Sequence, residues 1–153
     1  METPVNRIRE FSSQIAELTF QLLANCQEKE ERLAGQFGIT AAEFRTLRMF
    51  RDEPQLTVKV LVERVGLSGS RLSRILEALE EKGYLGRSID SQDRRSIDVS
   101  LTPKGVALAR NLEERFVQVH EEILEGIPEE LHEPLLLGLQ KMLASVEKKL
   151  KEM

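Results

Sequence analysis

Apolar residues recur at helical spacing over three long segments of the chain. The first segment, residues 7–34, places an apolar side chain at every third or fourth position, at Phe11, Ile15, Leu18, Leu22 and Cys26. The second begins at Pro103 and ends near Glu125, and the third follows Pro128. This period predicts three long amphipathic helices. Pro134 lies inside the third segment, where a proline either kinks a helix or marks its true start.

A shorter helix begins at Thr40. Residues 40–43 read Thr-Ala-Ala-Glu, which is the pattern of a capping box. In that arrangement the Thr40 hydroxyl accepts a hydrogen bond from the amide of Glu43, and the Glu43 carboxylate accepts one from the amide of Thr40. We expect this helix to end by Pro54.

Two further helices and a tight turn are predicted next. Thr57 is a suitable N-cap for a short helix to about Val65, and Gly66 then permits a sharp turn. Ser68 caps the following helix, residues 69–82, whose apolar stripe comprises Leu72, Ile75, Leu76 and Leu79. This order of elements is a helix-turn-helix.

After Gly83 the period of the pattern changes from helical to alternating. Residues 84–89 and 96–101 are predicted as strands, and the polar residues 90–93 between them have turn chemistry. The two strands form one hairpin with a polar tip. The sequence therefore predicts a mainly α fold with a small β-hairpin wing, a winged helix-turn-helix flanked by N- and C-terminal helices.

Composition places limits on the class of protein. Of the 153 residues, 41% are apolar and 31% are charged, and the formal net charge of −4 excludes a uniformly basic surface. Residues 57–105 nevertheless hold nine Lys/Arg against seven Asp/Glu, so a local basic patch is possible there. We expect a cytoplasmic protein, because there is no apolar run of membrane-spanning length, no signal peptide pattern and a single cysteine.

The candidate chemistry is recognition of double-stranded DNA. A helix fits the major groove, where arginine reads guanine edges and serine bonds a base or a phosphate. The first half of the 69–82 helix and its cap offer such side chains and no acid: Ser68, Ser70, Arg71, Ser73 and Arg74. The wing offers Arg87, Asp93, Arg94 and Arg95, of which Arg95 is suited to the minor groove, with Asp93 placed to hold it.

These residues resemble the MarR family of bacterial transcriptional regulators. The resemblance covers residues 57–105, and the order of the predicted elements resembles the family over most of the chain. It is carried by Gly66-Leu67-Ser68, by Arg74, by the run from Leu79 to Leu85, by the wing from Asp90 to Arg95, and by Leu101-Thr102-Pro103-Lys104-Gly105. The Asp-x-Arg element of the family's wing falls on Asp93 and Arg95.

The resemblance implies a ligand-responsive regulator, expected to be a repressor, that acts as a homodimer on a pseudo-palindromic operator. It implies a single domain over residues 1–153, with the winged core at about 37–102 and dimerisation helices at about 5–34 and 103–153. It also implies a small, often aromatic, effector, whose binding residues the sequence does not identify. The apolar stripes of the long helices independently favour a homodimer, because the small winged motif cannot cover them.

Two alternatives stay open beside DNA-binding regulation. The acidic net charge is compatible with a winged-helix module that binds protein instead of DNA. A thiol switch through Cys26 is the other. A cysteine buried on an apolar stripe is inert, whereas the basic helical neighbours Lys29 and Arg32 would favour the reactive thiolate.

Enzymatic and metal chemistry are not expected. The chain has two histidines, His120 and His132, and one cysteine, which give few pairs of nucleophile and base. No spacing of ligand residues matches a closed metal site, and no glycine-rich phosphate loop follows a strand. We therefore expect no catalytic residues, no metal and no cofactor.

Overall fold

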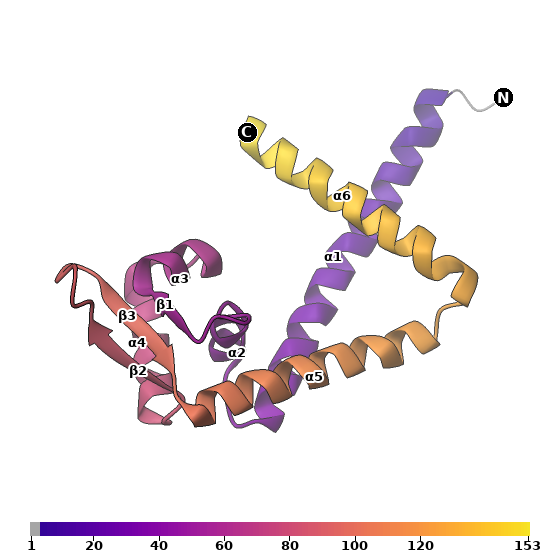
Figure 1. Cartoon of the computed structure of the whole chain (residues 1–153). Coiled ribbons are helices and arrows are strands. Elements are labelled where there is room, and N and C mark those ends of the chain that lie inside the picture. The colour runs from indigo at the N-terminus through magenta and orange to yellow at the C-terminus, as the bar shows by residue number, and fades with distance from the viewer. Residues whose placement is uncertain (1–3) are drawn as a thin grey trace. The chain divides into compact units, whose positions relative to one another are not determined.

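A computed structural model describes residues 4–153 (Figure 1). The chain divides into two compact units, one reaching to Glu113 and the other running from Glu114 to Met153. The division falls within one helix, α5 (Pro103–Glu125). The mainly helical fold with a small wing is confirmed, whereas the assignment of residues 1–153 to a single domain stays a prediction.

The first unit begins with two helices, α1 (Pro4–Gln36) and α2 (Ala41–Arg48). The capping box predicted at Thr40 is present: the Glu43 amide donates to Thr40 Oγ1 at 3.2 Å, and the Thr40 amide donates to Glu43 Oε2 at 2.9 Å. Helix α2 ends at Arg48, well before Pro54, because turns replace the helix from Met49 onward.

The helix-turn-helix consists of α3 (Val58–Val65) and α4 (Gly69–Glu81), as predicted. Thr57 caps α3, since its hydroxyl accepts a hydrogen bond from the Val60 amide at 3.2 Å. Gly66 ends α3 in the left-handed region, at φ 70°, where glycine has no steric penalty. The core beneath these helices is aliphatic and aromatic, and its fully buried members include Phe44, Leu47, Phe50, Leu61, Leu72, Leu76 and Leu79.

The sheet has three strands where the sequence predicted two. The predicted hairpin is β2 (Leu85–Ile89) with β3 (Ile97–Leu101), and β1 (Gln55–Thr57) adds to the other side of β3. The strand order is β1-β3-β2, and both pairings are antiparallel. We missed β1 because three residues are too few to show an alternating pattern.

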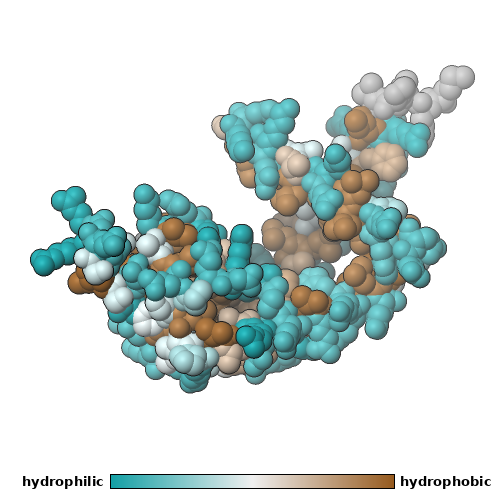
Figure 2. Space-filling model, in the orientation of Figure 1, coloured by the Kyte–Doolittle hydropathy of each residue, from teal (hydrophilic) through white to brown (hydrophobic). Residues whose placement is uncertain are grey.

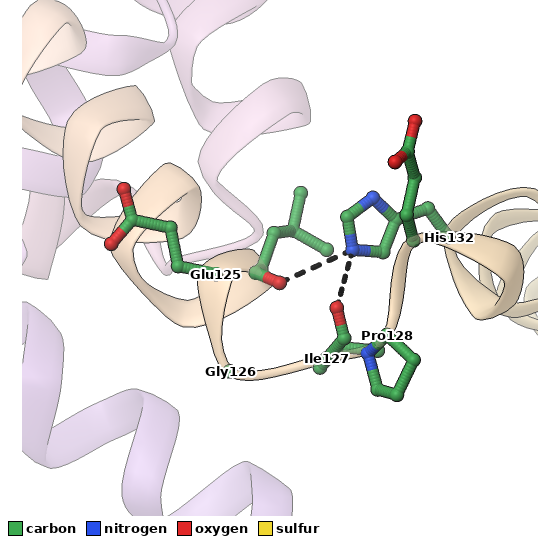
Figure 3. Close-up of a pocket in the computed structure, with 7 residues that line it drawn as sticks. Glu125, Gly126, Ile127, Pro128 and His132 are labelled. Carbon is green, nitrogen blue, oxygen red and sulfur yellow. Dashed lines mark hydrogen bonds between the residues drawn. The ribbon is translucent and has the colours of Figure 1, made fainter.

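The second unit consists of the later part of α5, a short 3₁₀ turn η1 (Glu129–Leu131) and α6 (His132–Glu152). Pro134 lies in the first turn of α6, so it marks the start of that helix and does not kink it. His132 Nε2 lies 3.1 Å from the Leu124 carbonyl oxygen and 2.9 Å from that of Ile127 (Figure 3). Both partners are acceptors, so Nε2 carries the proton. The side chain of His132 therefore donates to carbonyl groups at and just after the C-terminal end of α5.

Candidate nucleic-acid interface

Helix α4 presents its polar side chains to solvent because its apolar stripe is fixed in the core. Leu72, Leu76 and Leu79 are buried, each at most 1% exposed. The five residues predicted for the recognition helix are all exposed: Ser68, Ser70, Arg71, Ser73 and Arg74. The structure thus brings them together on one accessible surface at the N-terminal half of α4.

The N-terminus of α4 is capped in a way that leaves amide groups for an anion. The Ser68 hydroxyl accepts from the Arg71 amide at 3.4 Å and lies 3.3 Å from the Ser70 hydroxyl. No acidic residue lies in the first turn of α4. The positive end of the helix dipole therefore adds to the side-chain charge, which favours a phosphate at this position.

The two arginines of α4 differ from most structural arginines of the chain. Arg64, for example, pairs with Glu53 at 2.7 Å and also donates to the Met49 carbonyl oxygen at 2.9 Å. Within residues 4–153, neither Arg71 nor Arg74 has a carboxylate within ion-pair distance or a side-chain hydrogen bond. Their guanidinium groups are therefore available to a partner from solution.

The loop at the tip of the wing is held by its own aspartates. The Asp90 carboxylate accepts from the Gln92 amide at 2.8 Å, and the Asp93 carboxylate accepts from the Arg95 amide at 3.0 Å. Asp93 therefore holds the loop at Arg95 through the backbone amide of that residue. The side chains of Arg94 and Arg95 are exposed, and neither forms an ion pair in the described part of the chain.

Arg87 is the predicted wing arginine that forms an ion pair within the described residues. It pairs with Val99 in the strand register, so its side chain shares the inner face of the sheet with that buried residue. Its Nε and Nη2 atoms lie 2.9 and 2.8 Å from Oε2 of Glu80. This ion pair joins β2 to α4, which gives Arg87 a structural role in positioning the wing.

The junction between α4, β2 and α5 contains positioning residues whose contacts the sequence did not reveal. The Thr102 hydroxyl donates to the Gly83 carbonyl oxygen at 2.6 Å, and the Thr102 amide donates to that of Tyr84 at 3.0 Å. Lys104 Nζ donates to the Lys82 carbonyl oxygen at 2.9 Å and lies 4.7 Å from the centroid of the Tyr84 ring. Gly105 permits this close approach, because a Cβ there would lie 1.8 Å from the Tyr84 carbonyl oxygen.

A part-buried ion pair links the end of α4 to α2. Lys82 Nζ lies 2.7 Å from Oε2 and 3.0 Å from Oε1 of Glu43, whose side chain is 4% exposed. The same carboxylate completes the capping box with Thr40. The capping role of Glu43 was evident from its spacing, but the pairing across 39 residues was not.

The other candidate groups do not assemble into a reactive site. Cys26 is exposed in the single chain, whereas we had expected it to be buried on the apolar stripe. His120 Nδ1 lies 2.7 Å from the Phe116 carbonyl oxygen one turn earlier in α5. Within residues 4–153 there is no cluster of three metal-ligand residues and no helix long and apolar enough to span a bilayer.

A hollow lies at the turn between α5 and α6. It has a volume of about 640 Å³ and is lined by Leu124, Glu125, Gly126, Ile127, Pro128, Glu129 and His132 (Figure 3). None of the residues predicted to bind DNA lies in it.

Comparison with known sequences matches the winged region. Residues 37–96 match the model of the MarR family. The transcriptional regulator SarZ of Staphylococcus epidermidis is 36% identical over 70 residues, which is 46% of this chain and 47% of SarZ. SarZ of Staphylococcus aureus is 32% identical over 87 residues, or 57% and 59% of the two chains. The chain thus spans about half the length of the curated relatives it matches.

Solved structures match over a longer part of the chain. MepR, a transcription regulator of a Staphylococcus aureus multidrug efflux pump, is 25% identical with a TM-score of 0.73, covering 86% of this chain and 97% of MepR. The MepR–DNA complex is 26% identical, with a TM-score of 0.70 and the same coverage. AbsC of Streptomyces coelicolor, at 19% identity, shows the fold alone, with a TM-score of 0.77 over 100% of this chain and 99% of AbsC. The winged region, residues 37–96, is thus similar in sequence to the MarR family, and the described chain shares the fold of these solved regulators.

Proposed function

We propose that the protein is a transcriptional regulator that binds double-stranded DNA through α4 and the wing. The observation that carries this proposal is the pair of exposed arginine sites, Arg71 with Arg74 on α4 and Arg94 with Arg95 on the wing. None of these arginines pairs with a carboxylate in the described part of the chain. Uncompensated arginines on an otherwise acidic protein (net charge −4) fit a polyanionic partner.

The two sites have different roles in the proposed complex. Helix α4 enters the major groove with its N-terminal half, where Arg71 and Arg74 reach base edges and Ser70 and Ser73 bond bases or phosphates. Arg94 and Arg95 at the wing tip reach the backbone and the adjacent minor groove, whose negative potential attracts arginine. Ser68 contributes through the capped helix N-terminus, and Asp93 through the backbone of the loop.

The relatives favour the same partner. The SarZ proteins are described as transcriptional regulators, and MepR has been solved in complex with DNA. The part of this chain that matches the family, residues 37–96, contains every residue that we assign to DNA binding. Regulation of transcription is therefore the function most consistent with both the surface and its relatives.

The long helices support a homodimer as the active form. Large apolar side chains are exposed along α1, including Phe11 at 52%, Leu18 at 58% and Phe20 at 72%. In α6 the exposed set includes Leu139 at 53%, Leu143 at 60% and Leu150 at 65%. Figure 2 shows hydrophobic residues at the surface of the helical segments, coloured brown. Apolar surface of this extent is normally covered by a partner, and a second copy carries the same faces.

Dimerisation also explains the two-fold symmetry that we expect of the operator. Two copies of α4 in successive major grooves, about 34 Å apart, read half-sites related by two-fold symmetry. Ligand-responsive repression follows from the family resemblance: a small, often aromatic, effector stabilises a dimer whose α4 helices are wrongly spaced for DNA, and so releases it. Neither the identity nor the site of that effector enters the proposal.

The direct test is selection of DNA by the purified protein. Sheared genomic DNA of the host is incubated with the protein, and the retained fragments are sequenced. We expect enrichment of a two-fold-symmetric site by the wild type and its loss in the Arg74→Ala/Arg95→Ala double variant. Lys141→Ala, an exposed charge on α6, is a control that should retain the site. Failure of the wild type to enrich any fragment at low salt would contradict DNA binding and favour a protein-binding module.

A further inference from the structure

The distal end of the wing carries two large apolar side chains in solvent. Ile89, the last residue of β2, is 68% exposed, and Ile97, the first residue of β3, is 44% exposed. The two residues are partners in the antiparallel register. Single exposed apolar residues are ordinary, but two isoleucines facing each other at the end of a projecting hairpin form a surface.

The backbone pairing makes this surface continuous. The Asp90 amide donates to the Ser96 carbonyl oxygen at 3.0 Å, so residues 90 and 96 form a hydrogen-bonded pair. Hydrogen-bonded and non-hydrogen-bonded pairs alternate along an antiparallel ladder, and side chains approach more closely in the second kind. Ile89 and Ile97 are the adjoining, non-hydrogen-bonded pair, so their side chains meet in one patch.

The patch is the outer continuation of the inner face of the sheet. Alternate residues of a strand share a face, which places Leu85 and Val99 on the same side as the isoleucines. Leu85 and Val99 are 2% and 0% exposed, so this face is covered by the core near its base and uncovered at its end. The isoleucines therefore lie where the wing extends beyond the protein.

The loop beside the patch carries two arginines that form no ion pair within the described residues. Arg94 and Arg95 occupy the adjoining loop, with exposed guanidinium groups. The nearby carboxylates are already bonded: those of Asp90 and Asp93 accept backbone amides, and Asp98 Oδ2 accepts from Gln55 Nε2 at 3.1 Å. Figure 2 shows this end of the molecule as hydrophilic residues, in teal, beside a small hydrophobic area.

An apolar patch framed by arginines matches one surface in particular. The minor groove of duplex DNA has walls of deoxyribose, which are apolar, between two rows of phosphate. Proteins that enter this groove combine arginine with aliphatic side chains. We propose that Ile89 and Ile97 make apolar contact with the minor groove beside Arg94 and Arg95. This inference rests on the proposed function, because it adds an apolar component to the wing's contact with DNA.

The test separates apolar from ionic contact by the dependence of affinity on salt. Each phosphate neutralised by a cation contributes about −0.9 to the slope of log K against log salt concentration, whereas an apolar contact contributes nothing. Ile89→Thr and Ile97→Thr keep the branched shape that strands favour and remove apolar surface. We expect the affinity for the selected duplex to fall by about five- to thirtyfold in the double variant, with an unchanged slope.

Two controls separate loss of the apolar contact from a change in the structure of the wing. Ile89→Val keeps the apolar contact and should bind within about twofold of the wild type. Ser88→Thr changes an exposed residue on the opposite face of β2 and serves as the matched control for a substitution in this strand. Urea unfolding of every variant should give the wild-type midpoint, because the isoleucines are not part of the core. A lower slope in the isoleucine variant would show that it displaces the arginines, and would overturn the inference.

The remaining outcomes are equally decisive. Unchanged affinity of the double variant for a duplex that the wild type binds overturns the inference and leaves the proposed function intact. A smaller sedimenting species with unchanged DNA affinity would instead assign the patch to a protein contact, which also overturns it. Absence of salt-dependent DNA binding by the wild type removes the proposed function, and the inference with it.

Discussion

At the scale of single residues, Gly105 is the glycine at which an added Cβ would meet the closest neighbour in the described structure. The N-terminus of α5 approaches the Tyr84 carbonyl oxygen so closely that a Cβ at residue 105 would lie 1.8 Å from it. The neighbour is backbone, which cannot rotate away as a side chain can. The Leu-Thr-x-x-Gly motif at residues 101–105 is thus explained by this approach and by the two hydrogen bonds that Thr102 donates, to the carbonyl oxygens of Gly83 and Tyr84.

Gly105→Ala should therefore destabilise the first unit strongly, by about 3 kcal/mol, which is the upper range for a core that is overfilled. The measurement is urea unfolding followed by circular dichroism. Gly35→Ala is the matched control, because nothing lies within 4 Å of a Cβ built there in the described structure. Alanine in that α1 position should stabilise by about 0.5–1 kcal/mol. Equal stabilities of the two variants would show that the junction is looser than described.

Cys26 is the second residue with a specific expectation. It is exposed in the single chain, on the same stripe of α1 as Leu18 and Leu22. In the proposed dimer this stripe is covered, so the thiol should react slowly with a thiol reagent and peroxide should leave DNA affinity unchanged. Release of DNA on oxidation, abolished by Cys26→Ser, would establish the alternative of a thiol switch. Release by the serine variant as well would exclude Cys26 as the sensor.

At the scale of elements, the sequence predicted what depends on local signals. The caps at Thr40, Thr57 and Ser68 and the left-handed glycine at residue 66 all lie where spacing placed them. Strand β1 was missed because its three residues are defined by pairing with β3 and have no local pattern of their own. The residues of α4 that we propose for DNA contact could be identified from the sequence. They lie in a run without acidic residues, and the helical period separates exposed from buried positions.

Pairings between distant residues could not be predicted from spacing. The partners of Arg87 and Lys82 lie on other elements, and the sequence contains many acids that might serve. Side-chain partners depend on the fold as a whole, whereas caps and stripes depend on a few neighbouring residues.

The link between α2 and α4 gives a prediction at this scale. Glu43→Gln preserves the capping box, which accepts glutamine, but removes the charge that pairs with Lys82. Glu43→Ala removes both contacts and should destabilise by about 1–2 kcal/mol, more than Glu43→Gln, because the helix cap is lost as well as the ion pair. Urea unfolding of both variants, each alone and with Lys82→Met, separates the two contributions. If Lys82→Met lowers the free energy of unfolding by the same amount in the wild type and in the Glu43→Gln variant, the ion pair contributes nothing to stability.

At the scale of the whole molecule, the exposed apolar faces are the main feature that a single chain leaves unexplained. We expect the wild type to sediment at twice the chain mass of 17.5 kDa. Leu139→Glu places a charge on the apolar face of α6, where Leu139 is 53% exposed, and should shift the protein toward single chains. Ser145→Glu adds the same charge at an exposed position of α6 away from that stripe. A Leu139→Glu protein that stays dimeric would exclude this face from the interface.

The central claim is that the arginines of α4 and the wing bind duplex DNA. The most direct measurement is the salt dependence of binding to the selected duplex, by fluorescence anisotropy, for the wild type and Arg74→Ala/Arg95→Ala. If the dimer neutralises about 6–10 phosphates, affinity falls steeply with salt, and each arginine bound to phosphate lowers the slope by about one when removed. If Arg74 reads a base, its loss costs about 1–3 kcal/mol. A flat salt dependence, or a double variant that binds like the wild type, would contradict the claim.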